Sequence, residues 1–236
     1  FTFLLISRRS NKRAGTRFWM RGADENGDVA NFVETEQIFA RDGAIKSYVQ
    51  IRGSIPVSWS QQPDLSRLPP ISINHEESET MFDKHINKLT QEYGTVTAVC
   101  LTNQKGKEGP ITELYTSLSQ GRDKLEFHYF DFHHECRKMH YENIDKLLNE
   151  LQSGDFNGLY GFYASGTDLK QTGVVRTNCV DCLDRTNVVQ SKIAFRSLQD
   201  QLDGLEIGDY QFFNNIWTEN ADALSLQYAG TPAMKT

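Results

Sequence analysis

Cys179 and Arg185 are separated by five residues in the segment RTNCVDCLDRTN, and Thr186 follows directly. A loop of this length at the start of a helix can turn several backbone N–H groups toward the oxygens of a tetrahedral anion. The helix end and Arg185 are expected to lower the pKa of Cys179 and give a thiolate nucleophile. Arg185 would bind two phosphoryl oxygens through its planar guanidinium, and Thr186 would donate its hydroxyl to the thiolate. The spacing therefore predicts phosphoryl transfer to Cys179 and then attack by water, with no metal or other cofactor.

The residues between this cysteine and this arginine are expected to form the phosphate loop; they are Val180, Asp181, Cys182, Leu183 and Asp184. Two ionised carboxylates that point into such a loop would repel a dianion. One of them is therefore a candidate general acid, with a pKa raised by neighbouring negative charge, and we favour Asp181. The alternative is that both side chains turn outward. That alternative is at least as good for Asp184, which immediately precedes the helix and could satisfy its first N–H groups.

Two other chemistries compete for these cysteines. Cys179-x-x-Cys182 could be a redox pair, although nothing around it otherwise suggests a thioredoxin-like unit. A structural zinc site would need further ligands, and DFHHECRKMH, with His133, His134, Cys136 and His140, is the nearest candidate. A packed strand end with polar neighbours explains that cluster equally simply, so we expect no metal site.

The elements that must position the loop are predicted by the pattern of apolar residues. The first sixty residues indicate short strands, FTFLLIS, TRFWMRG, ANFVETEQIF and SYVQIRGSIPVSW, and residues 60–74 indicate an irregular connection. Helices and strands then alternate: helical spacing precedes TVTAVCL, KLEFHYFDF and GLYGFYA, and TGVVR precedes another helix. We therefore expect an α/β fold with a mixed, largely parallel sheet flanked by helices and a β-rich N-terminal portion. The loop would lie on a strand-to-helix turn, where open α/β sheets bind ligands.

Length and charge limit the function further. The 236 residues suit one large domain, the four cysteines do not form a disulfide framework, and no apolar run is long enough to cross a bilayer. The first 21 residues contain six basic residues and no acidic ones, within a chain whose net charge is −6. This distribution fits an anionic ligand or membrane surface better than nucleic acid, and a solvated hairpin loop is the open alternative.

The segment VVRTNCVDCLDRTNVVQ resembles the catalytic signature of the Sac-domain phosphoinositide phosphatases. Other blocks resemble the family in the family's order; they are FTFLLISRRSNKRAGTRFWMRG, VANFVETEQI, QIRGSIPVSW, NQKGKEG, FDFHHECRKM and NADALSLQYAGT. The similarity is greatest to the endoplasmic-reticulum and Golgi phosphatase branch, and the synaptojanin-type Sac domain comes second. The resemblance implies that residues 1–236 form a Sac-type catalytic domain lacking the family's N-terminal subdomain.

The resemblance also implies a substrate and a location. It predicts hydrolysis of phosphatidylinositol phosphates, mainly the 4-phosphate, with the 3-phosphate and the 3,5-bisphosphate as further substrates. It assigns Cys179 as the nucleophile and Arg185 as the phosphate-binding residue. Arg8, Arg9, Arg13 and Arg17 are expected to face substrate or anionic lipid on the cytosolic face of an internal membrane. The alternative is a non-catalytic phosphoinositide-binding or scaffolding module.

Overall fold

The computed structural model describes residues 1–64, 69–154 and 161–234. The strands are β1 (Thr2–Arg9), β2 (Val33–Arg41), β3 (Ala44–Arg52), β4 (Trp59–Gln61), β5 (Ile71–Ile73), β6 (Thr95–Cys100), β7 (Leu125–Tyr129), β8 (Tyr163–Ala164) and β9 (Gly173–Asn178). The helices are α1 (His75–Tyr93), α2 (Gly109–Ser119), α3 (Phe132–Glu135), α4 (Ile144–Ser153), α5 (Asp184–Leu202) and α6 (Gln211–Ala229). Short 3₁₀ turns occupy Gly106–Glu108, Arg137–Met139 and Tyr141–Asn143. Among the described residues no helix is both long and apolar enough to cross a membrane.

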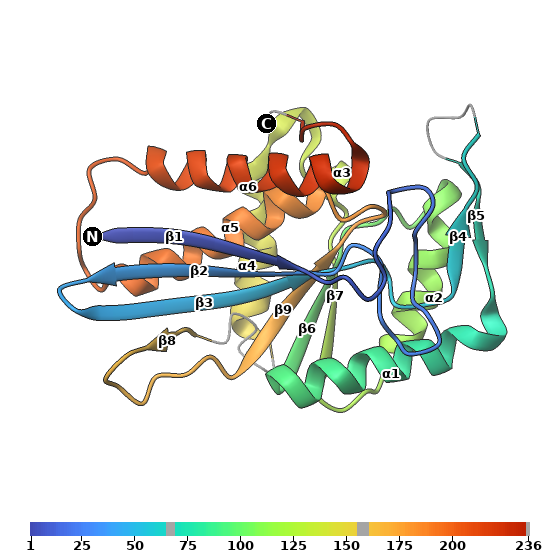
Figure 1. The fold of residues 1–236 in the computed structure, drawn as a ribbon, viewed down its shortest axis with the longest axis horizontal. Coiled ribbons are helices and arrows are strands. Elements are labelled where there is room, and N and C mark those ends of the chain that lie inside the picture. The colour runs from blue at the N-terminus through green and yellow to red at the C-terminus, as the bar shows by residue number, and fades with distance from the viewer. Residues whose placement is uncertain (65–68, 155–160, 235–236) are drawn as a thin grey trace.

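One sheet organises the chain, with the strand order β1-β2-β3-β9-β6-β7 (Figure 1). β1, β2 and β3 form an antiparallel meander, β8 adds to β3 in the antiparallel sense, and β3, β9, β6 and β7 are parallel neighbours. In this register Arg52 lies opposite Thr177, and Cys100 lies opposite Asn178. The carboxyl ends of β3, β9 and β6 therefore share one edge, which is where an open α/β sheet places its ligands.

Helices cover both faces of the parallel part of the sheet. Val174 packs among residues of α1 and α2 on one face, whereas its neighbour Val175 packs among residues of α4 and α5 on the other. This alternation follows from the two-residue period of a strand, and it explains why the adjacent residues Val174 and Val175 are both apolar. A third cluster joins α5 and α6 to β1 and β2, through residues such as Phe39 and Trp217.

The expected fold class is confirmed, and three details differ. TRFWMRG is not a strand: the N–H groups of Trp19 and Met20 both bond to the Thr16 carbonyl, so the segment forms a turn. The connection 60–74 contains the paired strands β4 and β5, and its residues 65–68 lie outside the described part of the chain. Residues 158–160 of the predicted GLYGFYA run also lie outside it. The long helix α6 was not predicted, although its buried residues Phe213, Trp217, Ala221, Leu224 and Tyr228 recur at helical spacing.

Candidate functional site

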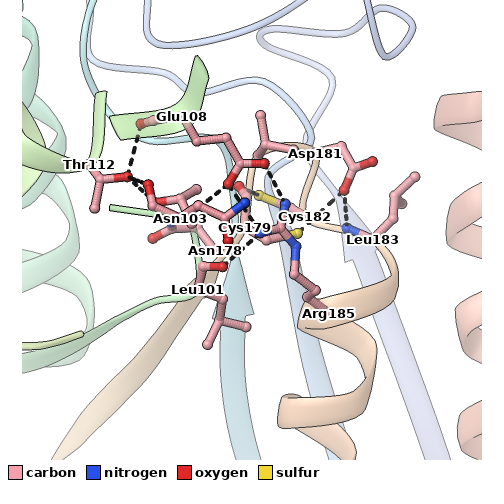
Figure 2. Close-up of polar contacts among 12 residues, drawn as sticks. Leu101, Asn103, Glu108, Thr112, Asn178, Cys179, Asp181, Cys182, Leu183 and Arg185 are labelled. Atoms are coloured by element: carbon pink, nitrogen blue, oxygen red, sulfur yellow. Dashed lines mark hydrogen bonds and ion pairs between the residues drawn. The ribbon is translucent and has the colours of Figure 1, made fainter. Parts of the chain in front are cut away.

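The predicted loop connects the end of β9 at Asn178 to the start of α5 at Asp184 (Figure 2). Cys179 is the first residue after the strand and is only 1% exposed. A 19-residue helix begins five residues later, so the partial positive charge of its first turn faces the loop. The strand-to-helix turn expected from the sequence is therefore present.

Two side chains from the loop and the helix contact the Cys179 sulfur. Its Sγ lies 3.3 Å from Oδ1 of Asp181, to which it donates. The hydroxyl of Thr186 donates to the same sulfur across 3.4 Å, and Thr186 is fully buried. The backbone N–H of Asp181 also faces the sulfur. A carboxylate and two donors thus converge on one thiol, which is what proton transfer and thiolate stabilisation both require.

The pKa of Cys179 is raised rather than lowered. Burial is the main cause and the charge of Asp181 adds to it, while Arg185 and the Thr186 hydroxyl act in the opposite direction without prevailing. The expectation that the helix end and Arg185 would produce a thiolate is therefore wrong for this conformation. The reason is that Asp181 places negative charge beside the sulfur and that burial removes water from it.

The Asp181 carboxylate points into the loop and occupies its anion-facing side. Besides the Cys179 thiol, its Oδ1 accepts a hydrogen bond of 3.2 Å from the Leu183 N–H. Its Oδ2 lies 3.7 Å from Nη1 of Arg17, and the side chain is 20% exposed. Oδ1 therefore takes the contacts that a phosphoryl oxygen would make with the loop, and a bound phosphate would displace it.

Arg185 is bound to a carboxylate on another part of the chain. Its two Nη atoms lie 3.1 Å and 2.9 Å from the two carboxylate oxygens of Glu108, and Nη1 also donates to the Leu101 carbonyl across 2.9 Å. Glu108 ends the 3₁₀ turn before α2, and its side chain is 5% exposed against 13% for Arg185. The planar guanidinium is thus used in a bidentate pair, the geometry that was expected for phosphate.

Glu108 is a site residue that sequence reasoning did not identify. Its segment NQKGKEG was noted only as a block of resemblance. A glutamate beside two lysines gives no signal of its own, and its partner lies 77 positions away in the sequence. Its Oε2 also accepts the Asn103 N–H across 2.7 Å, so the carboxylate is fixed from both sides.

The other loop residues face away from the sulfur. Cys182 has a left-handed backbone with φ of +57°, and its thiol lies 3.5 Å from the Cys179 carbonyl oxygen. Burial and the neighbouring Cys179 raise the pKa of Cys182 to about 12, so it stays a neutral thiol at physiological pH. Asp184 accepts the Met234 N–H across 3.0 Å and does not cap α5. Val180 and Leu183 are buried, and both cysteines are free thiols.

The four basic residues expected to face lipid are largely bound within the protein. Arg8 pairs with Glu34 and Glu36 while remaining half exposed, and Arg9 donates to the Gly15 carbonyl. Arg13 donates to the carbonyls of residues 21 and 22, and Arg17 pairs with Asp181. Of these four residues, Arg17 reaches the loop, and the half-exposed Arg8 still places charge in solvent.

Residues 133–136, the alternative metal cluster, are dispersed. His134 is exposed beside Glu135, and Cys136 is buried in the core. Within the residues that the structure describes, no group of three or more His, Cys, Asp or Glu side chains could bind a metal ion.

Three further residues that were not predicted contact the loop from outside. Arg21, Asn31 and Arg52 are all buried, and each donates to a loop carbonyl. They lie 130 to 159 positions before the residues they contact, a separation that no spacing rule could bridge.

Known proteins match this chain along its whole length. The family model described as the SacI homology domain matches residues 1–137, which end before Cys179. The phosphatidylinositol-3-phosphatase SAC1 of Drosophila melanogaster is 42% identical over 253 residues, covering 100% of this chain and 43% of the relative. The phosphoinositide phosphatase SAC6 of Arabidopsis thaliana is 43% identical, covering 98% of this chain and 42% of the relative. The SAC1 of Saccharomyces cerevisiae is 38% identical, covering 98% of this chain and 41% of the relative. The chain thus spans less than half the length of these relatives, and it belongs to the SacI homology domain family.

Proposed function

We propose that this chain hydrolyses the phosphate monoester of phosphatidylinositol phosphates through a phosphocysteine formed on Cys179. The observation that carries the proposal is the convergence of the Asp181 carboxylate and the Thr186 hydroxyl on a buried thiol at the start of a helix. A module that only binds a headgroup needs neither a thiol nor an adjacent carboxylate.

The first step moves one proton and exchanges one bond. Cys179 already donates to Oδ1 of Asp181 at 3.3 Å, so Asp181 takes the thiol proton as the phosphate ester displaces its carboxylate from the loop. The thiolate then attacks phosphorus, a sulfur–phosphorus bond forms, and the bond between phosphorus and the inositol oxygen breaks. Asp181 then gives this proton to the inositol oxygen and is again a carboxylate at the end of the step. One residue acts as base and then as acid, which needs no second carboxyl group in the loop.

The second step reverses these roles for water. Asp181 takes a proton from water, the water oxygen attacks phosphorus, and the sulfur–phosphorus bond breaks to release inorganic phosphate and restore the thiol. Throughout, the N–H groups of the loop and the first turn of α5 bind the phosphoryl oxygens. Arg185 joins them once it leaves Glu108.

The proposed substrates are phosphatidylinositol phosphates, with the 4-phosphate as the principal one and the 3,5-bisphosphate as another. The relatives from Drosophila melanogaster and Saccharomyces cerevisiae are both named phosphatidylinositol-3-phosphatases, so the 3-phosphate is included as well. Arg8, Arg9, Arg13 and Arg17 are proposed to aid docking to anionic lipid, chiefly through the half-exposed Arg8. The proposed location is the cytosolic face of the endoplasmic reticulum or Golgi membrane.

Phosphate release from a panel of short-chain phosphoinositides in EDTA tests this function. Wild type should release phosphate, Cys182→Ser should retain activity, and Cys179→Ser should be silent. Loss of activity in both cysteine variants would favour the redox alternative. An active Cys179→Ser protein would end the nucleophile assignment.

A second function, headgroup binding without turnover, is favoured by one observation. Arg185 is engaged by Glu108 in a buried bidentate pair, so the loop as it stands is not arranged around a phosphate. A folded wild-type protein that binds phosphoinositide vesicles but releases no phosphate would establish this alternative.

A further inference from the structure

Three consecutive carbonyl groups of the loop are each bound by a different side chain from the N-terminal part. Nη1 of Arg21 donates to the Val180 carbonyl at 3.1 Å, and Nδ2 of Asn31 donates to the Asp181 carbonyl at 3.1 Å. Nη1 of Arg52 donates to the Cys182 carbonyl at 3.3 Å. The loop is therefore held along its outer side by donors that no neighbouring loop residue supplies.

This pattern fixes which way the N–H groups point. In a trans peptide group the C=O and the next N–H point in opposite directions. Carbonyls 180, 181 and 182 that are bound on the outer side therefore turn the N–H groups of residues 181, 182 and 183 inward. Two of these N–H groups already meet acceptor atoms: that of Asp181 faces the Cys179 sulfur, and that of Leu183 bonds to the Asp181 carboxylate.

The two arginine donors are buried, and neither guanidinium pairs with a carboxylate among the described residues. Arg21 is 3% exposed, donates from Nε to Gln61 across 3.0 Å, and lies over the Trp59 ring at 5.4 Å. Arg52 is fully buried, also binds Asn187, and has no partner within the described chain for its Nε and Nη2. In the described residues no carboxylate forms a salt bridge with either guanidinium. Burial lowers the pKa of Arg52 to about 10, although the charges of Cys182 and Cys179 act in the opposite direction. Because Arg52 already donates to the carbonyl of Cys182, its charge lies beside the loop on which an ionised Cys179 would sit.

We propose that Arg21, Asn31 and Arg52 are positioning residues for the phosphate loop. They hold its carbonyls outward so that its N–H groups converge on an anion, and Arg52 supplies the fixed positive charge that favours the Cys179 thiolate. The inference deepens the proposed function and rests on it for the reaction. The loop geometry and the thiol chemistry can be tested without that function.

The test compares donor removals that are matched in size. Asn31→Asp removes the donor but tolerates the left-handed backbone at φ of +50°. Gln37→Glu is the control, because it makes the same amide-to-acid change at a buried donor, bound to the Ala194 carbonyl at 3.1 Å and away from the loop. Arg52→Met removes both the charge and the planar guanidinium, whereas Arg52→Lys keeps the charge but not the guanidinium. Each variant is assayed for melting temperature, for kcat and KM on a soluble short-chain phosphoinositide, and for the pH profile of iodoacetamide alkylation at Cys179, read by peptide mass.

The expected result is a loss that stability does not explain. Asn31→Asp should lower kcat about tenfold to a hundredfold with little change in KM, while Gln37→Glu, of similar melting temperature, stays near wild type. Arg52→Met should move the alkylation midpoint up by about one pH unit or more, and Arg52→Lys should not. The proposal is overturned if the Arg52→Met profile superimposes on wild type and Asn31→Asp loses no more activity than Gln37→Glu. If Arg52→Met does not fold, Asn31→Asp decides alone. If wild type hydrolyses no ester, the proposed function fails, and the alkylation profiles still decide this proposal.

Discussion

Replacing Glu108 by Gln should destabilise the free protein yet tighten its binding of phosphate. The side chain keeps its shape and one acceptor but loses the charge that Arg185 pairs with at 2.9 Å. Breaking a buried pair by removing one partner costs about 3–5 kcal/mol, and the retained acceptor places this variant near the lower limit. For a chain of this size, about 3 kcal/mol corresponds to a fall in melting temperature of roughly 6–12 °C.

The released guanidinium then becomes available to an anion. In wild type, separating Arg185 from Glu108 would reduce the free energy of phosphate binding. If that reduction is about 1.4–2.8 kcal/mol, the variant should bind inorganic phosphate about tenfold to a hundredfold more tightly. Added phosphate should therefore recover more melting temperature in Glu108→Gln than in wild type. Scanning calorimetry and titration calorimetry with sodium phosphate measure both quantities.

Glu36→Gln is the matched control, because Glu36 pairs with the half-exposed Arg8 at 2.7 Å. An exposed pair contributes about 0–1 kcal/mol, so this variant should change neither stability nor phosphate affinity appreciably. If Glu108→Gln loses stability and binds phosphate no more tightly than wild type, Glu108 does not compete with phosphate. The carboxylate would then be a support that orients Arg185 for binding.

Four further outcomes are expected. Cys179→Ser should abolish phosphate release while leaving vesicle binding intact, as co-sedimentation with phosphoinositide vesicles would show. Arg185→Lys should lose at least tenfold in kcat/KM because an ammonium cannot bind two oxygens; activity near wild type would mean that a point charge suffices. Arg8→Ala should weaken binding to anionic vesicles and reduce the salt dependence of that binding. Unchanged binding would mean that Arg8 has only a structural role in the sheet. Burial raises the pKa of Cys182 to about 12, so the folded state keeps a proton that the unfolded chain releases from about pH 9. Stability should therefore be unaffected by this group below pH 9 and fall above it by up to about 1.4 kcal/mol per pH unit, and Cys182→Ala should flatten that fall in urea titrations.

The sequence was sufficient to predict the strand, the turn and the helix that carry the site. The Cys179-x5-Arg185 spacing after the short strand TGVVR and before a helical stripe predicted the turn between β9 and α5, and the alternation of elements predicted the sheet. These features depend on neighbours within about twenty residues, where periodicity is informative.

The direction of side chains in the site could not be predicted in this way. Arg185 turns to Glu108, 77 positions away, and Arg21 reaches Val180 across 159 positions. Such contacts follow from the order of strands in the sheet, which places the ends of β3, β6 and β9 at one edge. The raised pKa of Cys179 is a product of the same packing, because it results from burial and from the inward turn of Asp181.

Two carboxylates thus bind the groups that are proposed to bind phosphate, and a phosphate ester should displace them in a definite order. Asp181 is 20% exposed and its contact with Arg17 is 3.7 Å long, so water can replace what it loses when it turns out of the loop. Glu108 is 5% exposed and binds Arg185 through both oxygens. Separating this pair exposes two buried charges at once, which is costly unless a dianion is already present to receive the guanidinium. A phosphate ester should therefore displace Asp181 first, through the loop N–H groups, and capture Arg185 second, so that transfer of Arg185 from Glu108 limits how tightly the loop binds its ligand.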